Sequence, residues 1–216
     1  MTPCPPPDPA RRRLLGAGSA ALIGFPALWT GVRAAPAAPL RPTPAQTEGP
    51  FYPLELPADG DADLLVNGTR RLRGGQPVTL GGRVVDLDGR PLAGARVEIW
   101  QCDGAGRYHH PRDRGGVADP DFQGWGHAIV DADGRYRFRT LRPVSYPGRT
   151  PHIHVKLKLG GRELLTTQLY VEGDPGNERD GLWRSLRDAV DRAALTRPFV
   201  AAADGLAADF PIVAAA

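Results

Sequence analysis

The chain has 216 residues, a net charge of +3 and an apolar share of 41%, values that suit a single globular domain. Residues 1–37 hold four arginines and one aspartate, so they account for the whole net charge and leave the rest of the chain neutral. A neutral domain lacks the basic surface of a nucleic-acid-binding protein, and that class is disfavoured. Because Cys4 lies in this leader, Cys102 alone cannot form a disulfide framework within one mature chain.

The N-terminus matches the pattern of an export signal. An arginine triplet at residues 11–13 precedes leucines, an apolar run covers residues 16–29, and small residues follow at 34–38. Paired arginines before leucine are typical of the twin-arginine route, and the run is shorter than the about 20 residues that span a membrane. We expect a twin-arginine signal peptide over residues 1–37 and a Pro/Ala linker over 38–46. The protein should then be periplasmic or extracellular, without stable membrane insertion after processing.

From residue 78 onward, short apolar segments alternate with turn sequences such as Asp86–Gly89 and Asp131–Gly134. The expected strands are residues 78–80, 82–85, 95–100, 128–130, 136–138, 152–159 and 165–171. Many short strands at close spacing predict an all-β domain, either an antiparallel β-sandwich or a barrel. Apolar spacing predicts one helix over Gly181–Leu195, and Phe210–Val213 is expected to be a closing edge strand.

Two histidines form the most informative short motif. His152 and His154 lie two apart on an expected strand, so their side chains share one face with Cα atoms about 6.6 Å apart. Two imidazoles in this arrangement can converge on one metal ion at bonds of about 2 Å. An exposed pair of strand histidines is the alternative. Pro151 places the pair at the mouth of the strand, where sites often occur, and the surrounding sequence matches no zinc-finger or zincin motif.

Two tyrosines stand at the ends of expected elements, namely Tyr108 and Tyr146. A phenolate is a hard anionic ligand that suits iron(III). Spacing alone does not select these residues, because a single tyrosine is more often a rim or core aromatic with a hydrogen-bonded hydroxyl group.

Longer motifs carry a family resemblance. They are Thr47–Pro53, Gly82–Gln101, Gly106–Tyr108, Asp119–Phe122, Asp133–Thr140, Tyr146–Pro147, Arg149–His154 and Thr167–Tyr170. Together they resemble the intradiol ring-cleavage dioxygenases, especially the β-subunit type of protocatechuate 3,4-dioxygenase. The resemblance runs from residue 47 to residue 213. It implies a prealbumin-like antiparallel β-sandwich with one short helix in its C-terminal half, and a catalytic domain over residues 47–216.

The resemblance also implies a cofactor and a reaction. Each chain would hold one non-haem iron(III) through Tyr108, Tyr146, His152 and His154. A catechol-type diol would bind as a dianion and replace Tyr146, which takes up a proton. O2 would then cleave the ring between the two hydroxyl-bearing carbons to give a cis,cis-muconate-type diacid. The partners implied are therefore a small catechol and O2, with no nucleic acid, and the chain could form a homo-oligomer or need a partner subunit.

Three further residues have two interpretations each. By resemblance, Arg149 lies beside the substrate ring and stabilises its carbanionic character, whereas an ordinary turn arginine would pair with an acid. Gln168 would orient a ligand as a catalytic residue, or else hydrogen-bond within its strand. Trp100 is expected to pack in the core rather than to touch substrate.

The sequence departs from the family in its loops. Only five residues separate Tyr146 from His152, so a loop that faces the substrate is shortened and the ring substituent stays undecided. Residues 38–77 are too short and too rich in Pro and Gly to form the helical dimerisation segment of the catechol 1,2-dioxygenases.

Two other classes of protein share parts of this pattern. The strand and turn motifs also resemble prealbumin-like modules, which are non-enzymatic spacers or binding domains, and the motif of four ligands with Arg149 and Gln168 argues against them. A β-sandwich that binds zinc or copper through His152, His154 and His127 is the third hypothesis.

Overall fold

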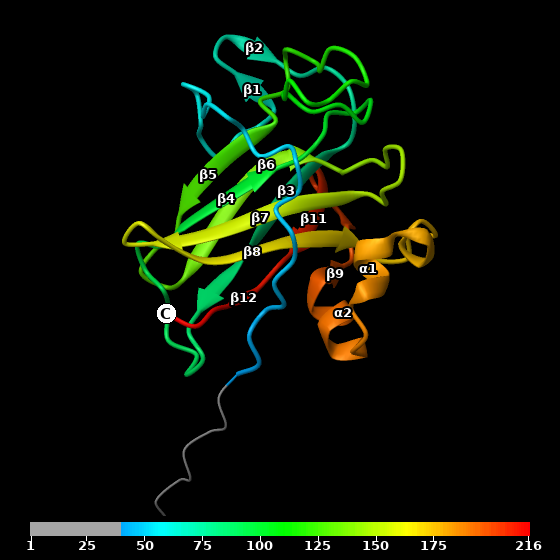
Figure 1. The fold of residues 1–216 in the computed structure, drawn as a ribbon. Helices are drawn as coiled ribbons and strands as arrows, with labels where there is room; N and C mark the ends of the chain where they lie inside the picture. Colours follow the sequence, from blue (N-terminus) through cyan, green and yellow to red (C-terminus); the bar gives the residue numbers. More distant parts are fainter. Residues whose placement is uncertain (1–39) are drawn as a thin grey trace, which may run out of the picture. The chain divides into compact units, whose positions relative to one another are not determined.

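The computed structural model describes residues 40–216, so the expected signal peptide lies outside the described residues. Residues 40–216 form two five-stranded sheets and one two-stranded sheet (Figure 1). The small sheet pairs β1 (Val66–Asn67) with β2 (Arg70–Arg71). None of the helices in this part of the chain is long and apolar enough to cross a membrane.

The first sheet is built around its longest strand, β3 (Pro77–Val85). On one side β3 pairs antiparallel with β6 (Arg135–Leu141). On its other side it pairs in parallel with β11 (Gly205–Asp209) and with β12 (Ile212–Val213). The edge strand β10 (Val200–Ala202) completes the sheet by pairing antiparallel with β11.

The second sheet carries the expected histidine strand at its centre. Its order is β5 (Trp125–Ile129), β4 (Arg96–Trp100), β7 (His152–Leu159), β8 (Arg162–Val171) and β9 (Thr196–Arg197). Apart from the parallel pairing of β8 with β9, neighbouring strands run antiparallel. The β-sandwich predicted from the sequence is confirmed, and each parallel pairing joins a short strand near the C-terminus to β3 or β8.

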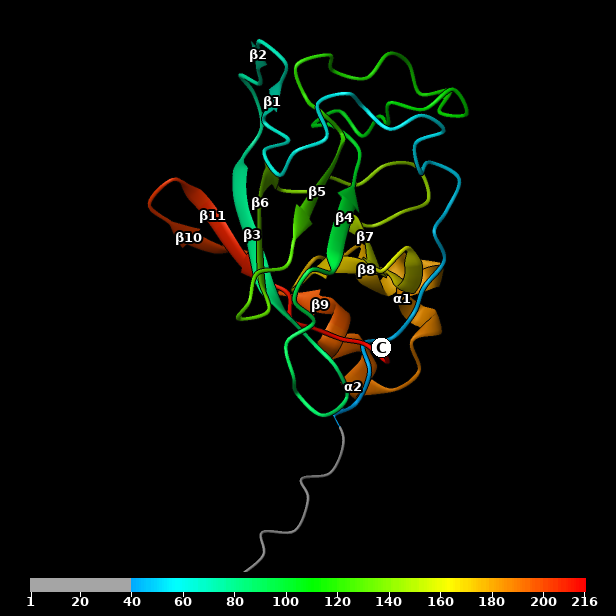
Figure 2. The same cartoon turned by 90° about the vertical axis from the view of Figure 1, so that its left-hand side faces the viewer.

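The core lies between the two sheets, which form the separate layers seen in Figure 2. Strand β6 shows the alternation that builds this core, because Tyr136 and Phe138 are buried while Arg135, Arg137 and Arg139 are exposed. From the other sheet, Ile153, Val155 and Leu157 of β7 point into the same core and are fully buried. Each large aliphatic side chain buried in this way contributes about 2 kcal/mol to folding.

The prediction of a single helix over Gly181–Leu195 is wrong, because this segment forms two separate helices. A short 3-10 turn, η1 (Asn177–Arg179), precedes α1 (Gly181–Ser185), and α2 follows over Ala189–Leu195. Between the helices Leu186 and Asp188 adopt extended backbone angles, and the Asp188 carboxylate accepts a hydrogen bond from the backbone N–H of Val190. Aspartate favours the N-cap over the helix interior, so Asp188 begins a second helix after the first has ended at Ser185.

The N-terminal segment lies across the second sheet. Its backbone N–H groups at Thr43 and Gln46 donate to the carbonyls of Val213 and Thr166, so the described part of the expected linker is held against the domain. The chain then continues over β8 and β7 (Figure 1). We call residues 40–53 the N-terminal strap. Because the strap covers the outer face of β7, this strand is buried on both faces from His152 to Leu157.

Candidate metal centre

His152 and His154 lie on the outer face of β7 beneath the N-terminal strap. Each side chain is only 1% exposed, so the alternative of an exposed strand pair is wrong. Their Nε2 atoms lie 3.2 Å apart. At metal–nitrogen bonds of about 2.1 Å, two nitrogens at that separation subtend roughly 100° at a shared ion. The pair therefore has the geometry of two ligands to one metal.

The surroundings of each imidazole fix how it is presented. His152 Nδ1 lies 2.7 Å from the carbonyl oxygen of Thr150, which requires Nδ1 to donate and leaves a lone pair on Nε2. The indole of Trp100 stacks against His154, with ring centroids 4.7 Å apart and planes 7° from parallel. Burial lowers the pKa of His152 to about 4 and the pKa of His154 well below its usual range. Both rings are thus neutral near pH 7, the state in which imidazole binds metals.

The two tyrosines approach the histidines from two loops that touch each other. Tyr108 follows the end of β4, and its ring centroid lies 6.2 Å from that of His154. Tyr146 lies 5.5 Å from His152 and 5.6 Å from Tyr108, centroid to centroid. A Cβ atom added at Gly106 would lie 3.2 Å from Tyr146 Cβ. The backbone of Gly106 also has a φ of 78°, which glycine adopts more readily than other residues. Glycine therefore lets the Tyr108 loop pack directly on the Tyr146 loop.

The phenol groups have the properties of ligands for a hard cation. Tyr108 is 4% exposed, and its hydroxyl group has no hydrogen-bond partner within residues 40–216. Burial raises the pKa of both tyrosines, most strongly that of Tyr108. An unpartnered buried hydroxyl is costly, and a cation that binds its phenolate form removes that cost. Two phenolate oxygens and two imidazole nitrogens form a hard, anionic donor set that fits iron(III).

The third histidine of the zinc or copper hypothesis does not join this pair. His127 lies on β5 opposite Glu98, and its ring packs near Trp125. No cluster of three or more His, Cys, Asp or Glu side chains in the described part of the chain has the arrangement of a metal site. The hypothesis of a zinc or copper site made from His152, His154 and His127 is therefore wrong.

A tight turn places Arg149 next to Tyr146. The residues Tyr146-Pro147-Gly148-Arg149 form a turn closed by a hydrogen bond of 2.9 Å from the Arg149 N–H to the Tyr146 carbonyl. Proline followed by a glycine with φ of 83° is the sequence preference of a type II turn. The positive charge of Arg149 opposes the effect of burial by lowering the pKa of Tyr146.

The Arg149 guanidinium is held by two partners. Its Nε donates to Asp180 Oδ2 at 2.8 Å, and one terminal nitrogen donates to Gln168 Oε1 at 2.5 Å. Gln168 sits on β8 directly opposite His154, and its amide nitrogen donates to the Thr47 carbonyl at 3.0 Å. The structure thus brings Arg149 and Gln168 together beside the four candidate ligands.

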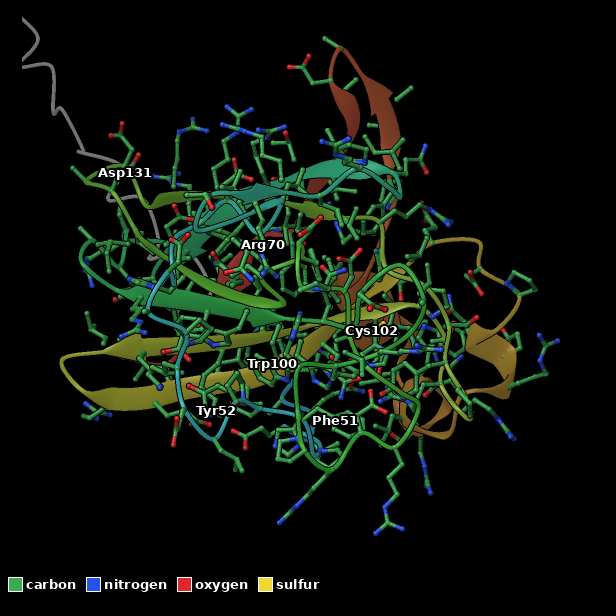
Figure 3. All side chains as sticks on the ribbon, turned by 90° about the horizontal axis from the view of Figure 1, so that it is seen from above. Phe51, Tyr52, Arg70, Trp100, Cys102 and Asp131 are labelled. Carbon is green, nitrogen blue, oxygen red and sulfur yellow. The ribbon has the colours of Figure 1, made fainter. Side chains whose placement is uncertain are left out.

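The N-terminal strap closes the other side of the site. Phe51 stacks on Tyr108 with ring centroids 4.6 Å apart, and Tyr52 meets Trp100 edge to face at 5.0 Å. Figure 3 shows Phe51, Tyr52 and Trp100 gathered on the same side of the sheet. Cys102 lies in the same cluster, fully buried, with its Sγ 3.7 Å from the Val144 carbonyl oxygen.

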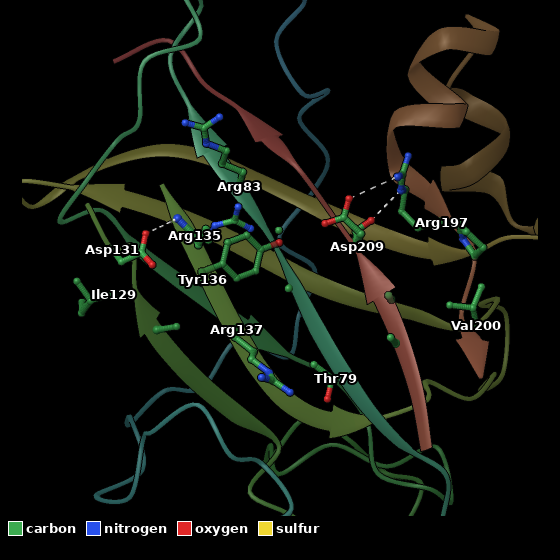
Figure 4. Close-up of a pocket in the computed structure, with 16 residues that line it drawn as sticks. Thr79, Arg83, Ile129, Asp131, Arg135, Tyr136, Arg137, Arg197, Val200 and Asp209 are labelled. Carbon is green, nitrogen blue, oxygen red and sulfur yellow. Dashed lines mark hydrogen bonds and ion pairs between the residues drawn. The ribbon is translucent and has the colours of Figure 1, made fainter. Parts of the chain in front are cut away.

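A cavity opens beside the tyrosine and arginine of the tight turn. It has a volume of about 380 Å³ and is lined by Tyr146, Arg149, Thr150 and residues of the 174–180 loop. A larger groove of about 750 Å³ lies on the outer face of the first sheet, lined by Thr79, Arg137 and Val200 among others (Figure 4). None of the candidate ligands lines that groove, whereas Tyr146 lines the smaller cavity.

Sequence reasoning missed Asp180, and it gave Trp100 only a packing role. An aspartate directly before an expected helix is a recognisable cap signal, but nothing in the sequence links it to an arginine 31 residues earlier. Trp100 is buried as expected, and the strand register adds that it lies opposite His154.

Comparisons with known proteins show the family to which the chain belongs. A family model described as Dioxygenase matches residues 47–214, so the chain belongs to the intradiol ring-cleavage dioxygenases, enzymes that cleave aromatic diols. The chain is 35% identical over 174 residues to the protocatechuate 3,4-dioxygenase beta chain of Burkholderia cepacia, an alignment that covers 75% of this chain and 73% of the relative.

Other relatives are longer than this chain. The catechol 1,2-dioxygenase of Candida albicans is 32% identical over 164 residues, which are 66% of this chain and 51% of the relative. The chain thus spans about half the length of such relatives.

Solved structures share the fold. The dioxygenase domain of a dioxygenase carbohydrate-binding protein fusion from Streptomyces sp. SirexAA-E matches with a TM-score of 0.63 and 36% identity, over 80% of this chain and 97% of that one. An intradiol ring-cleavage dioxygenase from Tetranychus urticae, at 22% identity, matches with a TM-score of 0.66 over 82% of this chain and 95% of that one. The family uses non-haem iron and acts on catechol-type substrates with O2, which excludes a purely structural module for this chain.

Proposed function

We propose that this chain is an exported dioxygenase that holds one iron(III) ion and cleaves a catechol-type diol to a cis,cis-muconate-type diacid. The observation that carries the proposal is the convergence of His152 Nε2 and His154 Nε2, 3.2 Å apart, with Tyr108 and Tyr146 next to them. The proposed ligands are Tyr108, Tyr146, His152 and His154. Membership of the dioxygenase family supports the reaction class.

Each residue of the site has a task that its contacts support. An iron(III) ion held by Tyr108, Tyr146, His152 and His154 would supply Lewis acidity, which would make the ring of a catecholate reactive toward O2. Thr150 and Trp100 hold the two imidazoles in position, through the Nδ1 contact of 2.7 Å and the ring stack of 4.7 Å. Phe51 of the N-terminal strap covers Tyr108 and excludes water from that side of the site.

Arg149 acts on the negative charge that develops on the substrate, and Gln168 positions Arg149. The Arg149 side chain is 16% exposed, so its charge acts in a poorly hydrated environment where electrostatic stabilisation is strong. Gln168 accepts from Arg149 and donates to the strap carbonyl of Thr47, which fixes the direction of its amide. We propose that Arg149 stabilises the carbanionic charge that develops on the ring of the bound catechol, and that Gln168 orients its guanidinium.

The substrate class follows from what the relatives share. Their names specify protocatechuate, catechol and hydroxyquinol, which are aromatic rings with adjacent hydroxyl groups and different substituents. We propose a vicinal aromatic diol as the substrate, which enters through the cavity beside Tyr146 and Arg149. The proposed partners are this small molecule and O2, without nucleic acid; a homo-oligomer is compatible with the proposal.

Purified protein is expected to contain about one iron per chain and to be red to burgundy. Tyrosine phenolates bound to iron(III) absorb visible light by charge transfer, whereas zinc gives no such band. Metal analysis and visible absorption measure both properties, and a panel of catechols assayed for O2 uptake tests the reaction. Colourless protein with stoichiometric zinc, still inactive after reconstitution with iron, would sink the proposal.

Export by the twin-arginine route is proposed from the leader sequence alone. Replacing Arg11 and Arg12 together by lysine is expected to leave the precursor in the cytoplasm, because that route reads the arginine pair. Cell fractionation and immunoblotting measure the distribution. Arg33→Lys, which lies after the apolar run, is the control and should be exported normally. Normal export of the double variant would refute this route but not the enzyme.

A further inference from the structure

Asp180 is a fully buried carboxylate whose hydrogen bonds are divided between a helix and the candidate site. Its Oδ1 accepts from the backbone N–H groups of Leu182 and Trp183 at 2.9 and 3.0 Å, and so caps α1. Its Oδ2 accepts from Arg149 Nε at 2.8 Å and from the Thr150 N–H at 3.0 Å. The side chain is 0% exposed. These four hydrogen bonds satisfy an ion that would otherwise be costly to bury.

The Arg149 guanidinium is therefore fixed at two separate nitrogens. Nε is bound to Asp180, and one terminal nitrogen is bound to Gln168 Oε1. A guanidinium carries five N–H donors in a rigid plane, so two fixed contacts determine the direction of the rest. The sequence offered two interpretations of Arg149, an ion pair with an acid or a place beside the substrate ring. With Asp180 at Nε and other N–H groups left over, both can be true.

The loop that carries Asp180 is itself anchored to the turn that carries Arg149. Asn177 Oδ1 accepts from Thr150 Oγ1 at 2.8 Å, and Asn177 Nδ2 donates to the Val171 carbonyl at 2.9 Å. Asn177 is 4% exposed. These hydrogen bonds hold the loop in place, so the Asp180 carboxylate has a fixed position in the wall of the cavity that Tyr146 and Arg149 also line.

We infer that Asp180 is a positioning residue, which holds Arg149 beside Tyr146 so that its free N–H groups face the bound diol. The inference rests on the proposed function. Asp180→Asn tests it cleanly because asparagine caps a helix about as well as aspartate. The amide oxygen can still accept from Leu182 and Trp183. The amide nitrogen then faces the Arg149 and Thr150 donors and cannot accept from them, so Arg149 loses the hydrogen bond that fixes its Nε.

A matched control exists within the same region. Asp188 caps α2 by accepting from the Val190 N–H at 2.8 Å, and its carboxylate pairs with the exposed Arg41 instead of with the site. Asp188→Asn removes the same charge from an equivalent cap. We expect Asp180→Asn to lower kcat on catechol by about 10- to 100-fold, the loss of a hydrogen bond between charged groups. Asp188→Asn should leave kcat within about 2-fold of wild type.

A double-mutant cycle separates positioning from a structural role. In an Arg149→Ala background, Asp180→Asn is expected to change kcat by less than about 2-fold, because the residue through which it acts is gone. Equal kcat losses in both backgrounds, or no loss in the wild-type background, would overturn the inference. Iron content and the melting temperature are measured for every variant. If Asp180→Asn does not fold, Asp180→Ser keeps a capping hydroxyl group and removes the carboxylate.

A second readout does not depend on turnover. A crystal structure of the Asp180→Asn variant is expected to show Arg149 turned away from Gln168, and an unmoved guanidinium would contradict the inference. Absence of ring cleavage in the wild-type protein across the catechol panel would instead count against the proposed function. In that case anaerobic catechol affinity replaces kcat in the cycle, and an unchanged affinity in Asp180→Asn overturns the inference.

Discussion

Arg149→Ala is expected to lower kcat by about 100-fold while the iron content stays that of wild type. A guanidinium in a site that excludes water stabilises a developing anion by about 3 kcal/mol, the effect of losing one such donor in other enzymes. The loss should appear mainly in kcat, because the anion is fully developed only in the transition state. Steady-state O2 uptake with catechol, together with metal analysis, measures the two quantities.

Two further arginine variants make this result interpretable. Arg149→Lys keeps the charge but loses the planar fork that bridges Asp180 and Gln168, so its kcat should lie between those of wild type and Arg149→Ala. Arg162→Ala, at the exposed start of β8, is the control and should behave as wild type. Arg149→Ala leaves the buried Asp180 carboxylate without its partner and should lower the stability of the variant. The assays are therefore run well below the melting temperature of that variant. Unchanged turnover would mean that another residue stabilises the anion.

Tyr146→Phe is expected to lower kcat/KM for catechol by about 100-fold while iron and a visible absorption band are retained. Tyr146 lies on the tight turn beside the open cavity, is only partly buried, and can accept the proton of an entering catechol hydroxyl group at its Oη atom. Loss of a positioned proton acceptor costs about 10²- to 10⁴-fold in rate. The band should persist because the Tyr108 phenolate remains.

Tyr108→Phe is the matched comparison. Tyr108 is buried beneath Phe51 and should stay bound throughout, so its removal should change the spectrum of the complex with catechol. Tyr146→Phe should leave that spectrum nearly unaltered. Anaerobic titration of both variants with catechol, followed by visible absorption, decides between the roles. If the Tyr146 variant changes the spectrum and the Tyr108 variant does not, the two roles are reversed.

The histidine pair was predictable from the sequence because strand periodicity alone puts His152 and His154 on one face. Their burial was not predictable, since it depends on the N-terminal strap, which arrives from about 100 residues earlier in the chain. Residue types suggested the tyrosines, but only the family resemblance selected them, because no local period relates Tyr108 to Tyr146.

Local competition explains where the fold departed from the prediction. Apolar spacing ran unbroken through Gly181–Leu195, but Asp188 offered a cap that the periodicity could not weigh. The pairing of Arg149 with Asp180 depends on how the 172–180 loop returns to the tight turn, and that path is set by long-range contacts such as the bond between Thr150 and Asn177. Contacts of this kind follow from the finished fold and have no short sequence signature.

The buried cysteine beside the site has a consequence for an enzyme that handles oxygen. Cys102 packs in one cluster with Trp100 and Tyr108, and burial raises its pKa to about 12. Oxidants and alkylating reagents attack the thiolate, so a thiol kept protonated and enclosed next to an oxygen-consuming centre is shielded from sulfenic acid formation. The same shielding makes Cys102 a reporter of local opening. A thiol reagent labels it only in molecules in which its packing with Trp100 and Tyr108 has opened, so the labelling rate measures how often this opening occurs.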